Sequence, residues 1–139
     1  MKARIQIVLV TVAFVLGTGL LLNSQTQITT LFTVQVPFDF RVGNSHLAAG
    51  RYTVSHIGTQ LIMLQRSDGT ANAVIPVMVS STAAGRSATK LVFNKYGNLY
   101  FLSQVWTHHD TQRHDCFRSR SEQSLLATRT ATVAAVAER

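Results

Sequence analysis

The stretch FTVQVPFDFRV, residues 32–42, alternates apolar and polar positions along its whole length. A period of two is typical of a β-strand with one buried and one solvated face, because successive side chains point to opposite sides of the backbone. Pro37 falls on the polar side and lacks a backbone N–H, so we expect an edge position, a bulge or a break there. The stretch therefore predicts one strand, or two collinear strands, with the apolar positions in the core.

Downstream of this stretch, apolar runs return at a spacing of about ten residues. Further strands are predicted at 51–57, 60–66, 71–79, 89–96 and 99–106. Asp68-Gly69 supplies the positive φ of a tight hairpin, and Gly97-Asn98 marks a second hairpin. The run 61–64 is apolar on both faces, which predicts a strand covered on both sides. The sequence predicts an all-β fold, a small antiparallel β-sandwich or barrel of about seven strands.

The C-terminal part follows a different pattern. Residues 107–117 are polar and predict an irregular loop. Ser119 and Glu122 have the spacing of a capping box, which predicts a short helix from about 120 to 127. The threonines and Val133 of 128–139 are poor helix formers, so we expect a frayed tail there.

The N-terminus predicts export. Lys2 and Arg4 precede an almost continuously apolar run, 5–22, which is the pattern of a signal peptide or a membrane anchor. Ser24-Gln25-Thr26 is only a mediocre cleavage site, so a cleaved signal and an uncleaved signal anchor both remain open. We expect three parts: the signal or anchor at 1–26, a β domain at 27–127 and the tail at 128–139. A bacterial protein of this kind is located in the periplasm or outside the cell, anchored through an N-terminal helix at 5–22 if that segment is retained.

Charge and cysteine content limit the classes of binding partner and the covalent cross-links that we expect. The 139 residues contain 13 Lys and Arg against 6 Asp and Glu, a net charge of +7. The basic residues are spread singly and no RNA-binding signature is present, so we do not expect a nucleic-acid partner. The excess favours anionic surfaces, and an envelope glycan, a lipid or another envelope protein remain the candidate partners. Cys116 is the only cysteine, so an intrachain disulfide is excluded.

Several motifs resemble those of a family of uncharacterised small exported all-β proteins common in acidobacteria. They cover roughly residues 34–126 and read VPFDF at 36–40, VGN at 42–44, LAAGRYTV at 47–54, SDG at 67–69, KLVF at 90–93, YG at 96–97, YFLSQVW at 100–106 and SRSE at 119–122. The resemblance implies an exported all-β domain with no established activity or ligand. The chain departs from the family at 107–117, where relatives usually carry glycine and proline.

This divergent loop contains potential metal ligands within nine residues. The candidate ligands are His108, His109, His114 and Cys116. Zinc or copper needs three or four such groups converging on the ion, and a flexible loop can supply them. The spacing matches no known zinc motif, so a solvated polar loop is the alternative, and no cofactor is expected.

Aromatic residues on the predicted strands are the other candidate site. Tyr52, Tyr96, Tyr100 and Trp106 would either stack on a sugar, line an apolar pocket or pack in the core, and their exposure distinguishes these cases. Ser, His and Asp occur without a nucleophile elbow, and nothing places two carboxylates in a cleft, so no catalytic residue is predicted. The sequence predicts a non-enzymatic structural or binding domain of the cell envelope, with a carrier or sensor of a glycan, lipid or metal as the alternative.

Overall fold

The computed structural model describes residues 25–81, 88–108 and 112–138. These contain ten strands and one helix: β1 (Ile28–Val36), β2 (Phe40–Val42), β3 (Ser45–Leu47), β4 (Gly50–Ile57), β5 (Leu61–Arg66), β6 (Asn72–Ser81), β7 (Lys90–Tyr96), β8 (Leu99–Trp106), β9 (Gln112–Cys116), α2 (Arg120–Leu126) and β10 (Thr132–Ala137). The all-β expectation is confirmed. Within these ranges no helix is long and apolar enough to cross a bilayer. The predicted export helix, at 5–22, lies outside the described residues.

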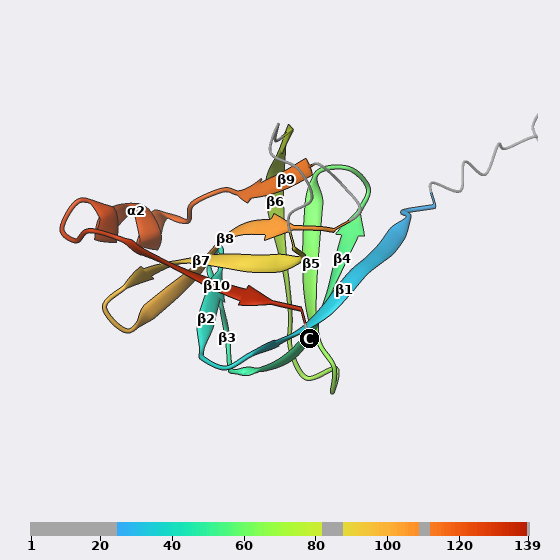
Figure 1. The fold of residues 1–139 in the computed structure, drawn as a ribbon, viewed down its shortest axis with the longest axis horizontal. Coiled ribbons are helices and arrows are strands. Elements are labelled where there is room, and N and C mark those ends of the chain that lie inside the picture. The colour runs from blue at the N-terminus through green and yellow to red at the C-terminus, as the bar shows by residue number, and fades with distance from the viewer. Residues whose placement is uncertain (1–24, 82–87, 109–111, 139) are drawn as a thin grey trace, which may run out of the picture.

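The strands form one open, mixed sheet that bends back on itself. Its order is β1-β4-β5-β6-β9-β8-β2-β3, and β7 joins β8 on one side and β10 on the other. Among the strands of the described residues, only β2 and β8 pair in parallel, through Arg41 and Phe101. In Figure 1, β4, β5 and β6 run across the direction of β7, β8 and β10. The bend lies at β6, which pairs with β5 along one part and with β9 along another.

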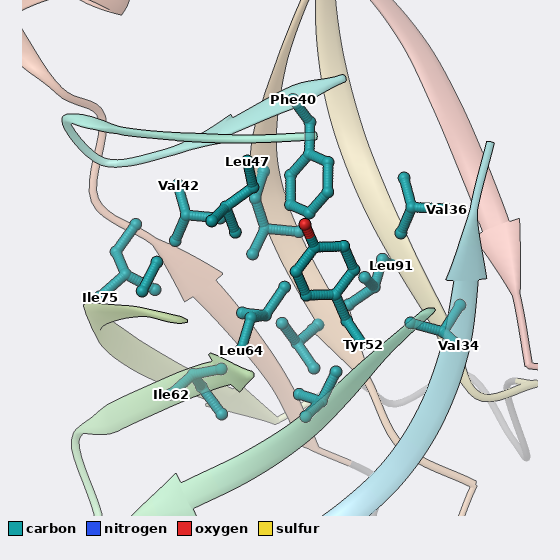
Figure 2. Packing of buried hydrophobic residues seen from close by; sticks show 14 of the residues in the cluster. Val34, Val36, Phe40, Val42, Leu47, Tyr52, Ile62, Leu64, Ile75 and Leu91 are labelled. Atoms are coloured by element: carbon teal, nitrogen blue, oxygen red, sulfur yellow. The ribbon is translucent and has the colours of Figure 1, made fainter. Parts of the chain in front are cut away.

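The core lies inside this bend (Figure 2). Tyr52, Phe40 and Phe93 are at most 1% exposed, and the ring of Phe40 meets the other two edge to face at 5.2 and 5.4 Å between centroids. Of the apolar positions of 32–42, Phe32, Val34, Val36, Phe40 and Val42 are buried, as their alternation predicts, and Phe38 is half-buried against the same core. Their apolar side chains leave water together, which is the main favourable term in folding.

Local signals placed the early elements correctly. β1 ends at Val36 and β2 begins at Phe40, so the strand is interrupted at Pro37, as expected. Asp39 stabilises this break, since its Oδ1 accepts a hydrogen bond from the Ala49 N–H at 2.9 Å. Gly69 has the predicted positive φ of 74° in the turn between β5 and β6.

The described residues do not form the predicted small antiparallel sandwich or barrel of about seven strands: they contain ten strands in one open, mixed sheet. β2, of three residues, is the second of the two strands that the stretch 32–42 allows. The additional strands are β3, of three residues, after the turn at Gly43, β9, in the predicted loop 107–117, and β10, in the predicted frayed tail. Neither β9 nor β10 has a clean apolar alternation. Each forms because its backbone pairs with neighbouring strands: β9 with β6 and β8, and β10 with β7.

The faces of two further strands are set by strand pairing. Beside a register shift between Val92 and Phe93, Leu102 of β8 joins the main core, whereas Phe101 is buried beside Tyr96. The run 61–64 was expected to be covered on both sides. Ile62 and Leu64 are fully buried, but Leu61 is 36% exposed on the outer face.

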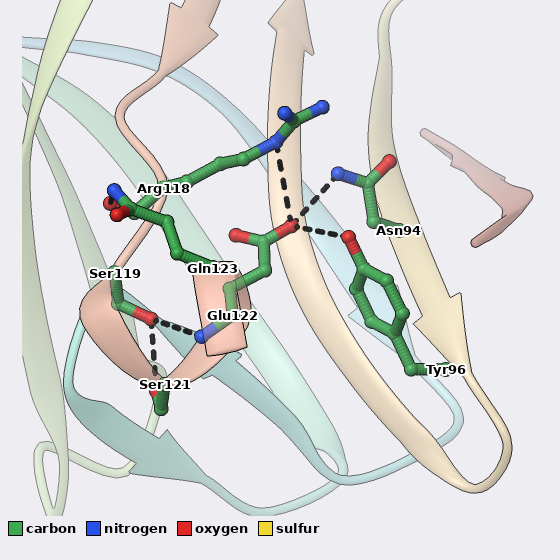
Figure 3. A network of polar contacts seen from close by, with 7 residues as sticks. All are labelled: Asn94, Tyr96, Arg118, Ser119, Ser121, Glu122 and Gln123. Carbon is green, nitrogen blue, oxygen red and sulfur yellow. Dashed lines mark hydrogen bonds and ion pairs between the residues drawn. The ribbon is translucent and has the colours of Figure 1, made fainter. Parts of the chain in front are cut away.

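The helix α2 begins as the sequence predicted. Ser119 is its N-cap and accepts a hydrogen bond from the Glu122 N–H at 3.2 Å. The Glu122 carboxylate, however, is only 2% exposed and points to the sheet (Figure 3). Its Oε1 accepts hydrogen bonds from Asn94 Nδ2 at 2.8 Å and from the Tyr96 hydroxyl at 3.2 Å, and Arg118 Nε lies 4.0 Å away. Glu122 therefore fixes α2 to β7.

Candidate functional site

The four candidate aromatic residues have different environments. Tyr52 and Tyr96 are fully buried, and each hydroxyl donates a hydrogen bond, to the Ala48 carbonyl at 2.6 Å and to Glu122 respectively. Burial is the first cause that raises the pKa of both phenols. By the criterion of exposure these two residues belong to the core rather than to a surface platform.

Tyr100 is half-buried and already has a stacking partner. Its ring lies on Phe38 at 3.9 Å between centroids and 15° between planes. Lys95 Nζ lies 5.3 Å from the ring centroid. Because Phe38 occupies one face of the ring, Tyr100 is less suited than an open ring to stack on a ligand.

Trp106 is the candidate that remains at the surface. It is half-exposed on β8, between Lys90 on β7 and Arg113 on β9, which are its direct cross-strand neighbours. Lys90 Nζ lies 5.1 Å and Arg113 Cζ 5.8 Å from the indole ring. Cations at such distances are attracted to the face of the ring. We call Lys90, Trp106 and Arg113 the Trp106 row.

Neighbouring polar groups position this row. The indole N–H donates to Gln104 Oε1 at 3.0 Å. Arg113 Nε forms an ion pair with Asp115 at 2.9 Å, and the Ser80 hydroxyl donates to the same carboxylate at 2.9 Å. An ion pair as exposed as this one adds little stability, but it restrains the guanidinium beside the ring. The row thus combines an aromatic surface with two cations and several hydrogen-bonding groups.

Two of the candidate metal ligands, His114 and Cys116, lie in β9 rather than in the predicted loop, and His108 is exposed after β8. His109 lies outside the described residues, and the backbone N–H of His108 donates to Thr89 Oγ1 at 2.9 Å. His114 is 1% exposed in β9, and its ring meets that of His56 edge to face at 4.4 Å between centroids. Burial, followed by the Asp115 charge, raises the pKa of the Cys116 thiol to about 12. Among the described residues no group of three or more potential ligands is placed to hold a metal ion.

Sequence reasoning identified Trp106 but missed its neighbours. Lys90 and Arg113 lie 16 and 7 positions away in the chain, and only the pairing of three strands brings them to one ring. Arg113 was assigned to a loop, so no periodicity could place it. The only available signal was the KLVF and YFLSQVW pair of runs, which predicts a hairpin but not its outer face.

Comparison of the chain with protein-family models, with curated proteins and with solved structures found no match.

Proposed function

We propose that this chain is an exported, non-enzymatic β domain of the bacterial cell envelope that binds an anionic glycan at the Trp106 row. The observation that carries the proposal is the half-exposed indole between two cationic side chains on adjacent strands. The basic, apolar N-terminus and the resemblance to exported proteins of acidobacteria support the location. Both the cleaved and the anchored form agree with it.

The chemistry of the row suits an anionic sugar. An indole face packs against the C–H groups of a pyranose ring and removes apolar surface of both partners from water. Lys90 supplies the charge that a carboxylate or phosphate on the sugar requires, and Arg113, whose Nε is paired with Asp115, adds its remaining N–H donors. Gln104 offers amide groups beside the ring for sugar hydroxyls.

The test is binding of the full chain to an anionic and to a neutral polysaccharide by calorimetry. Trp106→Ala is expected to weaken binding of the anionic polymer at least tenfold. Lys90→Gln with Arg113→Gln is expected to remove the preference for the anionic polymer. Phe117→Ala, an exposed aromatic residue outside the row, is the matched control and should change neither value. Equal binding by wild type and Trp106→Ala would refute the site.

A second candidate is a carrier or sensor of a small ligand, favoured by a different observation. A hollow of about 460 Å³ lies at the ends of β1, β7 and β8, lined in part by Phe32, Thr89 and Thr107. The Thr107 hydroxyl is buried there, and the described residues offer it no hydrogen-bond partner. Native mass spectrometry of protein extracted from the envelope of the host tests this candidate. Added mass would support a carried ligand, and the mass of the chain itself would report whether the first 24–26 residues are removed.

A further inference from the structure

One face of the sheet changes from polar to apolar along its strands. On the outer side of β1, β4, β5 and β6, the strand pairing sets the residues in cross-strand rows. The rows are Thr33-Thr53-Gln65-Asn72, then Thr30-Ser55-Met63-Val74, then Ile28-Ile57-Leu61-Pro76. All of these side chains are uncharged. We call the last set, Ile28, Ile57, Leu61 and Pro76, the apolar row.

Three members of the apolar row, Ile28, Leu61 and Pro76, are exposed, and Ile57 is half-buried between them. Ile28 is 58% and Leu61 36% exposed. Phe117, 52% exposed, continues the row, because its backbone N–H donates to the Pro76 carbonyl at 3.4 Å. Met78, 57% exposed, joins Leu61, Pro76 and Phe117 in lining a shallow groove of about 620 Å³. Adjacent exposed apolar side chains of this kind mark a surface that contacts an apolar partner.

The place of the row in the chain indicates which partner. It begins at Ile28, directly after Gln27, whose carbonyl accepts the Gly58 N–H at 3.1 Å. Ile28 is six residues beyond Leu22, the last residue of the apolar run predicted for export. Six residues span at most about 20 Å, so a run that enters a bilayer holds this end of the sheet close to the lipid surface. Figure 1 shows β1 extending from the body of the sheet toward this N-terminal end.

We propose that the apolar row rests on a phospholipid bilayer, with the polar rows of the same face directed away from it. The charge of the chain, +7, favours a bilayer rich in anionic lipids. The inference rests on the proposed export of the domain but not on the glycan site. It extends the membrane contact beyond residues 5–22, where the sequence placed it.

Depth measurements on the full chain test the proposal. In a Cys116→Ala background, Leu61→Cys and Gln65→Cys place one thiol each on the same face of β5, in the apolar row and in the first polar row. Each is labelled with a polarity-sensitive fluorophore, and the protein is reconstituted with vesicles of phosphatidylglycerol and phosphatidylcholine. We expect a blue shift at position 61 and at least threefold stronger quenching by brominated lipid than at 65. Depth is the readout because a retained N-terminal segment would hold every variant on the vesicles.

The following results would contradict contact between the apolar row and the bilayer. Equal, water-like emission at both positions overturns the proposal, as does a blue shift at 61 without vesicles, which would mean that a second copy covers the row. Absence of vesicle binding by a chain that has lost its N-terminal segment also overturns it. If a cysteine at 61 impairs folding, Ile28→Cys against Thr33→Cys repeats the comparison on β1. None of these results would change glycan binding that depends on Trp106, so the two proposals can be tested separately.

Discussion

Tyr52 and Tyr96 are both fully buried, but the two regions around them are built differently. Tyr52 lies in the main core, with Phe40 against its ring, and its hydroxyl reaches one backbone carbonyl (Figure 2). Tyr96 lies under α2, and its hydroxyl shares the Glu122 carboxylate with Asn94 (Figure 3). The region around Tyr52 is stabilised by the packing of apolar side chains, and the region around Tyr96 by hydrogen bonds to one carboxylate.

The two regions are therefore stabilised by different kinds of interaction. Apolar packing tolerates many arrangements of similar volume, whereas a buried carboxylate with its donors fixes one position and is costly to disrupt. The main core therefore stabilises the bent sheet, and the network at Glu122 holds α2 in place before the chain returns to β7 as β10. Substitutions in each region should separate these contributions.

The largest effect is expected in the main core. Phe93→Ala should lower the free energy of unfolding by about 3–5 kcal/mol, because it removes a fully buried ring and leaves a cavity. Leu99→Ala, in the same hairpin but 39% exposed, should cost less than about 1 kcal/mol. Urea unfolding followed by circular dichroism measures both. Similar values for the two variants would contradict a single well-packed core.

The next effect is expected at the network. Glu122→Ala removes the acceptor of Asn94 and Tyr96 and should lower stability by about 3 kcal/mol. Glu122→Gln keeps an oxygen acceptor and should cost about 1 kcal/mol. Glu138→Ala, at an exposed carboxylate, is the control and should stay within about 0.5 kcal/mol of wild type. The network would be shown to be unimportant if Glu122→Ala unfolded at the same urea concentration as the control.

A pair of hydroxyl deletions compares the regions directly. Tyr96→Phe removes a bond to a charged acceptor and should cost about 2 kcal/mol, against about 1 kcal/mol for Tyr52→Phe, whose partner is a neutral carbonyl. In a Glu122→Ala background the cost of Tyr96→Phe should fall, whereas that of Tyr52→Phe should not. A double-mutant cycle by urea unfolding measures this coupling, and its absence would mean that Tyr96 and Glu122 do not interact in solution.

The smallest effect at neutral pH concerns Cys116. Its pKa is raised to about 12 in the folded chain, and an unfolded thiol titrates near 8.5–9. Below pH 8 both states hold the proton and this contribution to stability is complete. Between about pH 9 and 12 only the unfolded state loses it, so stability should fall with rising pH, by about 1.4 kcal/mol per pH unit.

Chemical denaturation from pH 7 to 11 tests this expectation. Cys116→Ala should cost about 1 kcal/mol at pH 7 and flatten the decline that begins near pH 9. The decline from the raised pKa values of Tyr52 and Tyr96 should remain, beginning near pH 10. An unchanged decline in the variant would show that the Cys116 thiol ionises as easily in the folded as in the unfolded chain.

The sequence correctly predicted the features that depend on residues close together along the chain. The alternation in 32–42 and the Asp68-Gly69 turn specify strand faces and a hairpin within a few residues, and the helix at 120 follows from the Ser119 cap. It failed for Glu122, whose spacing fits a capping box, because the carboxylate is drawn instead to donors on a strand 28 positions earlier. It also placed His114 in a polar loop, although β9 places this residue in the interior.

By itself, the sequence determined that this protein is an all-β domain, where most of its strands begin and turn, and that one short helix follows them. It did so because side-chain alternation, glycine turns and helix caps act over a few residues. Only the tertiary structure decided that β9 and β10 exist, that Lys90 and Arg113 flank Trp106, and that Ile28, Leu61 and Pro76 are exposed in one cross-strand row. Each of these depends on strand pairings between distant segments, and a register shift of one residue would send every side chain to the opposite face.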